Sequence, residues 1–313
     1  MADIVITEFM DDEVARTLAV EHDVLYDPSL VDRPGDLTAA ATNARALIVR
    51  NRTCVDEPLL AQCRKLKVIG RLGVGLERID LDACRRHGVV VCAAHGANAI
   101  AVAEYVIAGV LMLRRGAYQA THEVMAGAWP REALIGGEVS GRRLGLVGFG
   151  DIARHVARRA DALGMEVVAF DPFVHAEDPS WRELGVTSLT FEDVLETSDA
   201  LSLHVPLTSE TRHLLDRAAF DRMPRGAILV NTTRGGVVDE PAMIDALRDG
   251  RLSGAMIDVF ATEPLPAAVG SLYSGIPNLI LTPHIAGVSR ESNRWLSVLT
   301  VNNVLEVLAK ASD

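Results

Sequence analysis

One segment near the middle of the chain limits the possible folds more than any other. It reads LGLVGFGDIA (Leu144–Ala153), an apolar run followed by G-x-G-x-x-A, and a helical pattern then continues to Leu163. Gly148 permits a tight turn, Gly150 lets the backbone approach a pyrophosphate, and the small Ala153 lets the helix pack on a sheet. Because a helix N-terminus offers free N–H groups and a positive dipole, the segment predicts a strand–turn–helix unit that binds a dinucleotide.

The residues that follow favour NAD as this dinucleotide. A second apolar run, Glu166–Phe170, ends at Asp171, 21 residues after Gly150, where a carboxylate accepts hydrogen bonds from the adenosine ribose. No Arg or Lys follows Asp171 directly, which argues against NADP. Taken alone, the glycines fit an ordinary turn and Asp171 fits a helix cap before Pro172. Asp151, in the first helical turn, would repel a pyrophosphate unless its side chain points outward.

Short apolar runs alternate with helical patterns along all 313 residues, which predicts an α/β protein with mostly parallel sheets. This length favours two domains. A long buried helix is expected from Asn98 to Arg115, an irregular extension over 116–141, and a final amphipathic helix over Glu291–Leu308. The predicted strands are Ile4–Thr7, Ala46–Val49, Val68–Arg71, Val89–Cys92, Leu144–Val147, Glu166–Phe170, Ala200–Leu203, Ala227–Val230, Gly254–Val259 and Leu279–Leu281, with a weak one near Val186–Ser188.

Charge and composition exclude several classes of partner. The formal net charge of −11 would repel phosphate backbones, so nucleic acid is not expected as a partner. The longest apolar stretch, Ala99–Leu113, contains Glu104 and is too short to span a bilayer, so no membrane contact is expected. The four cysteines lack CxxC spacing, which favours buried thiols over a metal site. With no secretory signal at its start, the chain is expected in the cytoplasm.

Three ionisable residues lie just past the ends of apolar runs in the second half of the chain: Arg234, Glu263 and His284. The carboxyl ends of parallel strands form the edge of a doubly wound sheet where ligands bind. Singly, His284 fits a core histidine, and Arg234 and Glu263 fit surface charges. Their occurrence at successive strand ends favours a shared site.

At this point the sequence resembles the D-isomer-specific 2-hydroxyacid dehydrogenase family. The resemblance covers nearly the whole chain and rests on the segments LKVIGRLGVGLERIDL, AVAE, GRRLGLVGFGDIA, FDP, LHVPLT, NTTRGGVVDE, DVFATEP and TPHIAG. It implies two Rossmann-like doubly wound domains with a cleft between them. Residues 1–98 plus 288–313 would form the substrate-binding domain, and residues 99–287 the NAD-binding domain. The long helix and the extension after it resemble the family's dimer contact, so a homodimer is expected.

The resemblance also implies a role for each residue of the site. His284 would be the general acid–base, Glu263 would orient and stabilise its ring, and Arg234 would hold the substrate carboxylate. Asp258 is expected near the nicotinamide, and His204 is expected to be structural or near the cofactor. Backbone groups of the first domain would also bind the substrate carboxylate, at Val74 and Gly75. The expected cofactor-binding residues are Gly148, Gly150, Asp151, Ile152, Asp171, Pro206, Thr232, Thr233, Asp258 and Gly287.

Arginines at strand ends of the first domain suggest a substrate with two anionic groups. Arg50, Arg52 and Arg71 all follow or end predicted strands, and Arg50 and Arg71 match positions that resemble substrate-binding arginines of phosphoglycerate dehydrogenases. The alternative is that these arginines are surface groups or form salt bridges. The resemblance implies, as the expected substrate, a three-carbon acid such as (S)-3-sulfolactate, which is interconverted with 3-sulfopyruvate. The alternatives are 3-phosphoglycerate or another D-2-hydroxy acid.

Two rival functions remain open at the level of sequence. Oxidation of formate or phosphite uses the same framework, but formate enzymes of this type usually carry Gln at the position of Glu263. Some relatives act as NAD-sensing corepressors, a binding function that keeps the same catalytic residues. The chain lacks an obvious disordered tail for partner recruitment, which favours the enzyme.

Overall fold

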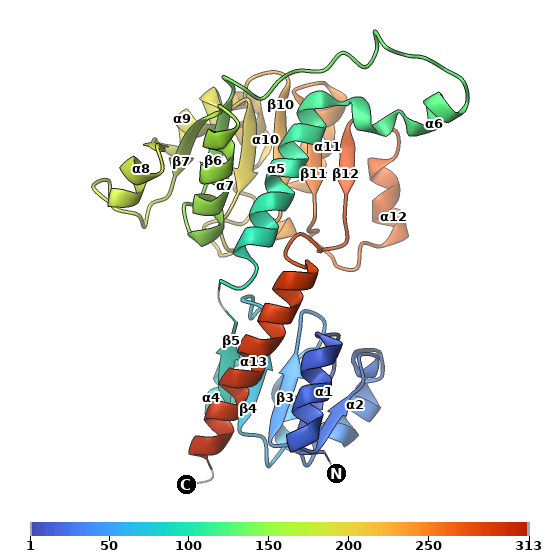
Figure 1. Ribbon diagram of the computed structural model, residues 1–313, viewed down its shortest axis with the longest axis vertical. Helices are drawn as coiled ribbons and strands as arrows, with labels where there is room; N and C mark the ends of the chain where they lie inside the picture. Colours follow the sequence, from blue (N-terminus) through green and yellow to red (C-terminus); the bar gives the residue numbers. More distant parts are fainter. Residues whose placement is uncertain (1, 95, 312–313) are drawn as a thin grey trace. The chain divides into compact units, whose positions relative to one another are not determined.

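The computed structural model describes residues 2–94 and 96–311 (Figure 1). The chain divides into two compact units, one formed by Met1–Asn98 with Val288–Asp313 and the other by Ala99–Gly287. Each unit contains its own parallel sheet, which confirms the predicted α/β class. No helix in the described part of the chain has the length and apolar character needed to span a membrane.

The first unit is a five-stranded parallel sheet with the strand order β2-β1-β3-β4-β5. This order is typical of doubly wound sheets. The chain places β2 on one side of β1 and β3 on the other, and this switch leaves a crevice at the carboxyl ends of β1 and β3. Glu8 follows β1 and Arg50 follows β3, so both lie at this edge. The elements are β1 (Ile4–Ile6), α1 (Asp12–Glu21), β2 (Val24–Tyr26), α2 (Pro34–Ala41), β3 (Ala46–Val49), α3 (Glu57–Gln62), β4 (Val68–Arg71), α4 (Leu81–Arg86), β5 (Val90–Ala93) and α13 (Arg290–Lys310), with a 3-10 turn at Leu30–Asp32.

Side chains alternate between the two faces of this sheet and fill a separate core on each. Ile4 and Ile6 of β1 pack with residues of α1 and α13, whereas Val5 packs with residues of α2, α3 and α4. Val304 of α13 is fully buried against the sheet. The last helix of the chain therefore completes the first unit rather than the second.

The second unit is a seven-stranded parallel sheet with the order β12-β11-β10-β9-β6-β7-β8. Its first strand, β6, lies between β9 and β7, so the reversal in strand order falls between β6 and β9. The elements are α5 (Ala99–Arg115), α6 (Thr121–Met125), β6 (Arg143–Val147), α7 (Asp151–Ala162), β7 (Glu166–Phe170), α8 (Pro179–Glu183), β8 (Thr187–Ser188), α9 (Phe191–Thr197), β9 (Ala200–Leu203), α10 (Arg217–Arg222), β10 (Ala227–Asn231), α11 (Glu240–Arg248), β11 (Leu252–Ile257), α12 (Ala267–Gly270) and β12 (Leu279–Leu281), with 3-10 turns at Ala117–Gln119, Gly235–Val237 and Ser271–Tyr273.

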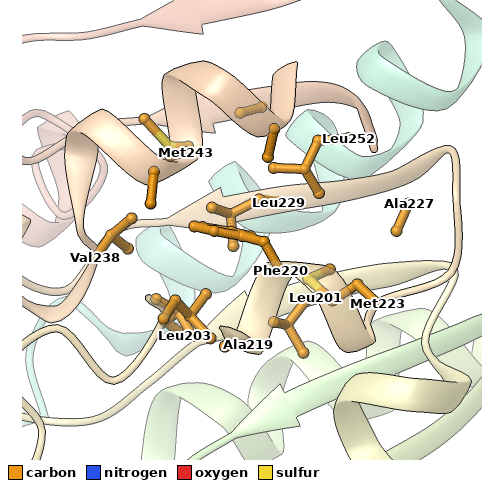
Figure 2. Close-up of a cluster of buried hydrophobic side chains, with 14 of the residues drawn as sticks. Leu201, Leu203, Ala219, Phe220, Met223, Ala227, Leu229, Val238, Met243 and Leu252 are labelled. Atoms are coloured by element: carbon orange, nitrogen blue, oxygen red, sulfur yellow. The ribbon is translucent and has the colours of Figure 1, made fainter. Parts of the chain in front are cut away.

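Two apolar clusters cover the faces of the second sheet. Figure 2 shows part of one, where Leu203 and Leu229 of the strands meet Phe220 of α10 and Met243 of α11. The other cluster joins β6 to α5 and α7 and includes fully buried Val106 on α5. This burial of the strands on both faces explains why they read as continuous apolar runs in the sequence.

The extension after α5 carries little regular structure. Residues 116–141 hold one 3-10 turn and the short α6, and they expose large apolar side chains to solvent. Met125, Trp129 and Ile135 are each at least 74% exposed. The extension therefore carries exposed apolar side chains.

Candidate active site

The turn between β6 and α7 brings two strand ends of the second unit together. Gly148 has φ +94°, and a Cβ atom there would lie 2.5 Å from the carbonyl oxygen of His204. Gly150 is the N-cap of α7 and has open space where a Cβ would be, and Ala153 is fully buried. The first N–H groups of α7 have no acceptor within the helix. The turn can therefore offer backbone N–H groups to an anion at close range.

Carboxylates on either side of this turn have different roles. Asp171, at the end of β7, accepts a hydrogen bond from the Phe149 N–H at 2.7 Å through Oδ2 and from the Phe173 N–H at 2.9 Å through Oδ1. Its carboxylate thus lies directly beside the glycine-rich turn. The side chain of Asp151 is 63% exposed and lies 3.8 Å from Nε2 of His155, one turn along α7. Asp151 is therefore exposed and lies beside His155 on α7.

The loop after β10 is shaped by an asparagine that the sequence analysis did not single out. Asn231 is 1% exposed, and its Oδ1 accepts hydrogen bonds from the N–H (3.0 Å) and the hydroxyl (2.8 Å) of Thr233. Its Nδ2 donates to the carbonyl of Arg234 at 3.1 Å. An Asn that bonds to the backbone two residues later forms an Asx-turn, and an Asn followed by Thr at a strand end is the signal that could have revealed it.

Close backbone packing joins the loop of Arg234 to the loop of Glu263. A Cβ atom on Gly235 would overlap the backbone of Phe260, so only glycine permits this approach. The Ala261 N–H donates to Oε1 of Glu240 at 2.7 Å, which ties the second loop to the start of α11. The two loops therefore form one structure at the ends of β10 and β11.

Glu263 and His284 form a hydrogen-bonded pair, with 2.7 Å between Oε2 and Nδ1. Oε1 of Glu263 also accepts the Phe260 N–H at 3.0 Å. Burial raises the pKa of Glu263, but its hydrogen bonds with His284 and Phe260 and the charges of His284 and Arg234 outweigh this and lower the pKa below its usual value. An ionised Glu263 accepts the Nδ1 proton, which leaves Nε2 of His284 to exchange a proton with a ligand.

The backbone of His284 adopts a conformation that residues other than glycine rarely occupy. Its φ is +54°, and its N–H donates to the carbonyl of Asp258 at 2.8 Å. The Asp258 carboxylate is 1% exposed and accepts the N–H groups of Ile285 and Ala286, both at 2.9 Å, and the hydroxyl of Thr282 at 2.6 Å. Asp258, predicted near the nicotinamide, thus fixes the loop of His284 in this structure.

A cavity of about 340 Å³ lies against the Glu263–His284 pair within the second unit. Most of its surface is apolar. Low polarity next to a charged pair strengthens the interaction between the two groups. The residues that line it are Phe260, Glu263, Leu265, Leu281, Thr282, Pro283 and His284.

His204, at the end of β9, carries a buried ring. No partner among the described residues hydrogen-bonds to Nδ1 or Nε2, and burial lowers the pKa of His204 to about 3. The imidazole is therefore neutral. The buried Oγ1 of Thr232 likewise has no partner in the described part of the chain, whereas Pro206 is exposed and Gly287 is partly exposed.

In the first unit, Glu8 organises the loop after β3. It is 3% exposed, and its two oxygens accept four backbone N–H groups, those of residues 50, 51, 52 and 53. The guanidinium of Arg50 is buried over the ring of Phe9 at 3.9 Å and donates from Nη1 to Oδ1 of Asn293 at 2.8 Å. Burial and the nearby charge of Arg71 lower the pKa of Arg50 to about 10, so it remains positively charged. No carboxylate in the described residues forms an ion pair with Arg50.

The other predicted residues of the first unit lie at the end of β4 and in the loop after it. The side chain of Arg71 turns back on this loop, where Nε donates to the carbonyl of Gly75 at 2.8 Å and Nη1 donates to that of Leu72. Val74 is 40% exposed between them. Arg52, in contrast, is an exposed partner of Asp32. Arg50 and Arg71 are thus brought together at neighbouring strand ends, while Arg52 points to another part of the unit.

The four cysteines differ in their exposure. Among residues 2–94 and 96–311, no group of three or more His, Cys, Asp or Glu side chains could hold a metal ion. Cys63 and Cys84 are buried as predicted, and burial raises the pKa of both thiols. Cys54 is exposed and Cys92 is partly exposed, so the prediction of buried thiols was wrong for these two.

Comparison with known proteins gives a consistent result. Residues 107–286 match the family model described as D-isomer specific 2-hydroxyacid dehydrogenase, NAD binding domain. The (S)-sulfolactate dehydrogenase of Chromohalobacter salexigens is 52% identical over 308 residues, which cover 98% of this chain and 99% of that protein.

Two more distant relatives extend the comparison. The D-3-phosphoglycerate dehydrogenase of Bacillus subtilis is 40% identical over 261 residues, or 83% of this chain and 49% of that protein, so the match spans only about half of the longer enzyme. The apo-structure of D-lactate dehydrogenase from Escherichia coli superposes with a TM-score of 0.85 at 28% identity and covers 98% of this chain and 96% of that one.

Proposed function

Because this chain belongs to the D-isomer specific 2-hydroxyacid dehydrogenase family, we propose that it interconverts a three-carbon 2-hydroxy acid bearing a second anion, (S)-3-sulfolactate, with its 2-oxo acid. The class itself follows from the family: the protein is an oxidoreductase that uses NAD. The observation that carries the class of chemistry is the Glu263–His284 pair, with 2.7 Å between Oε2 and Nδ1, formed by the loops after β11 and β12.

The residues of the glycine-rich turn fit NAD. Gly150 leaves open space where a Cβ would be, the N-terminus of α7 is free of a side-chain cap, and Asp171 lies beside the turn. We assign the pyrophosphate to this turn and the adenosine ribose to Asp171. Bound NAD supplies the hydride acceptor at carbon 4 of its nicotinamide. The other residues proposed to contact it are Ile152, Pro206, Thr232, Thr233 and Gly287.

The reaction needs a proton acceptor for the hydroxyl and a cation for the carboxylate of the acid. In oxidation, Nε2 of His284 takes the hydroxyl proton as the C2–H bond gives up its hydride, and in reduction it returns the proton. Glu263 holds the ring through Nδ1 and stabilises the imidazolium. Arg234 binds the carboxylate and polarises the C2 oxygen. Arg234, Glu263 and His284 therefore divide binding, orientation and proton transfer between them.

The second anion is inferred from the first unit. Arg50 keeps its charge although it is buried beside the like charge of Arg71. An anionic group at the edge formed by β3 and β4 would offset this repulsion, whereas a neutral methyl group would not. The 52% identity with a sulfolactate dehydrogenase supports a sulfonate as this anion. Val74 and Gly75 lie in the loop after Arg71, and we assign their backbone groups to the substrate carboxylate.

A substrate panel tests this proposal. Reduction of 3-sulfopyruvate, 3-phosphohydroxypyruvate and pyruvate by NADH is followed by absorbance in the wild type, in Arg71→Ala and in Arg52→Ala. We expect the sulfonate to exceed pyruvate in kcat/KM by a charge-assisted contact of about 1.5–3 kcal/mol. Arg71→Ala should erase much of this margin. Arg52→Ala is the matched control, because that side chain pairs with Asp32.

The same substrate panel also distinguishes between the candidate substrates and functions. A preference for pyruvate would contradict a second anion and leave the enzyme class intact. A preference for 3-phosphohydroxypyruvate would favour the second candidate, 3-phosphoglycerate, which the 40% identity with a phosphoglycerate dehydrogenase supports. The absence of turnover with any 2-oxo acid would favour an NAD-sensing protein.

We also propose that the protein is a homodimer formed through the extension over residues 116–141. Tyr118, Met125, Trp129 and Ile135 expose apolar surface there, and burial of such surface drives association. Sedimentation of the wild type and of Trp129→Ser tests the proposal. A monomeric wild type would contradict it.

A further inference from the structure

A chain of hydrogen bonds connects the helix α5 to the loop of His284. The hydroxyl of Tyr105, on α5, contacts Oγ1 of Thr282, the residue that follows β12. Thr282 in turn donates its hydroxyl proton to Oδ1 of Asp258 at 2.6 Å. Residues 177 positions apart in sequence thus meet inside the second unit.

Donor counting fixes the direction of this chain. Thr282 has one hydroxyl proton, and a carboxylate such as Asp258 can only accept it. Tyr105 must therefore be the donor to Oγ1 of Thr282. Burial raises the pKa of Tyr105 above its usual value, and the charge of Asp258 adds to this, so its hydroxyl stays protonated. The three residues form an ordered sequence of donors that ends on the carboxylate.

Asp258 connects this chain of hydrogen bonds to the backbone of His284. Its carboxylate accepts the N–H groups of Ile285 and Ala286, and its carbonyl accepts the N–H of His284. His284 has φ +54°, a conformation that persists only when the surroundings hold it. The direction of the His284 side chain is set by this left-handed backbone conformation. The contact of its ring with Glu263 therefore depends on that conformation.

We propose that Tyr105 is a positioning residue for proton transfer: through Thr282 and Asp258 it holds the left-handed backbone of His284, and so keeps Nδ1 on Glu263 and Nε2 toward the substrate. The inference rests on the proposed role of His284 as the acid–base. Tyr105 touches neither substrate nor cofactor in this scheme. It acts on the rate of the proton-transfer step and not on cofactor affinity.

Removal of one hydroxyl tests the proposal. Tyr105→Phe keeps the ring and its packing, and we expect kcat to fall about threefold to tenfold, the usual effect of one lost hydrogen bond. The KM and the Kd for NADH should stay within about twofold of the wild type on this reasoning. Tyr118→Phe is the matched control, because Tyr118 is 63% exposed and lies in the extension after α5. An unchanged kcat in Tyr105→Phe would overturn the proposal.

A double-mutant cycle separates positioning from general destabilisation. Thr282→Val removes the hydroxyl that links Tyr105 to Asp258 and should lower kcat, while Thr282→Ser should recover a kcat well above that of Thr282→Val. If Tyr105 acts only through this hydroxyl, adding Tyr105→Phe to Thr282→Val should change kcat no further. Two effects that simply multiply would show that Tyr105 does not act through Thr282.

Failure of this inference is distinct from failure of the proposed function. His284→Ala is measured in the same assay, with NADH affinity as the check that each variant is folded. A large loss in His284→Ala with a normal Tyr105→Phe overturns the inference alone. Near-normal turnover in His284→Ala overturns the role of His284, and the inference falls with it.

Discussion

The Glu263–His284 pair of the second unit and the charged residues Glu8 and Arg71 of the first unit are used in different ways. In the second unit, Glu263 and His284 bond to each other, side chain to side chain. In the first unit, Glu8 and Arg71 direct their charges at backbone groups, the N–H groups of residues 50–53 and the carbonyls of their own loop. Both sheets are parallel and doubly wound, so the difference arises from the loops and not from the frame.

The contrast indicates a division of work. A pair of ionisable side chains can gain and lose a proton during a reaction. The carboxylate of Glu8 instead accepts four backbone N–H groups and so keeps its loop in place. Two buried basic side chains also differ between the units. Arg50 is positively charged in the first unit, and His204 is neutral in the second. We infer that the first unit presents a fixed surface and the second carries out the chemistry.

The largest effect should come from the second unit. His284→Ala should lower turnover by about 100-fold or more, the usual contribution of a positioned acid–base group. NADH binding should survive, and the exposed His122→Ala serves as control. Steady-state kinetics with a 2-oxo acid and NADH measure this change. If the variant keeps near-normal turnover, the acid–base is another group and the division of work is wrong.

The matching change in the first unit should affect folding rather than chemistry. Glu8→Ala leaves four backbone N–H groups without their acceptor, so the free energy of unfolding should fall by about 3 kcal/mol. Urea unfolding of both proteins measures the difference. Glu13→Ala is the control, since Glu13 pairs with Arg294 on an exposed surface and should matter little. A stable variant with impaired turnover would mean that Glu8 takes part in the reaction.

The neutral state of His204 should appear as a dependence of stability on pH. Its pKa is about 3 in the folded chain and 6.5 ordinarily, so the unfolded chain takes up the proton first as the pH falls. Stability should therefore decrease from about pH 6.5 downward, with a slope from this residue of up to about 1.4 kcal/mol per pH unit. Urea unfolding at several pH values should show a shallower slope for His204→Phe than for the wild type or for His122→Phe. Parallel slopes would show that the ring is accessible to protons.

The smallest effect concerns the choice of cofactor. Asp171 should reject the 2′-phosphate of NADP by its charge, so kcat/KM for NAD should exceed that for NADP by at least about tenfold, or about 1.4 kcal/mol. Asp171→Ser should narrow this ratio. Equal use of both cofactors by the wild type would contradict the assignment of the ribose to Asp171.

The sequence predicts the strands that are buried on both faces. Ala46–Val49, Val68–Arg71 and Ala200–Leu203 begin and end where the structure has them, because a parallel strand under helices must be largely apolar. The strand Val24–Tyr26 was missed. It lies at the edge of its sheet and is partly exposed, and its apolar run of three residues between charged residues is too short to stand out.

Some residues of the candidate site were likewise predicted from the sequence, and others were not. Arg234, Glu263 and His284 were predicted from their places after apolar runs and from family motifs. The roles of Asn231, Glu8 and Tyr105 were not, because each depends on which loop meets it in space. Asp258 shows the limit most clearly, since the motif that contains it does not reveal that its carboxylate is bonded to three groups of the loop after β12.

The carboxylate of Glu8 has a consequence for the exchange of backbone hydrogens with solvent. Loop amides normally exchange quickly, because water reaches them without unfolding of the chain. Here a single buried carboxylate binds the amides of residues 50–53, so those protons can leave only when the pocket around Glu8 opens. A stretch without regular secondary structure should therefore exchange as slowly as the strand β3 that precedes it, and its deuterium uptake would report the opening of the first unit.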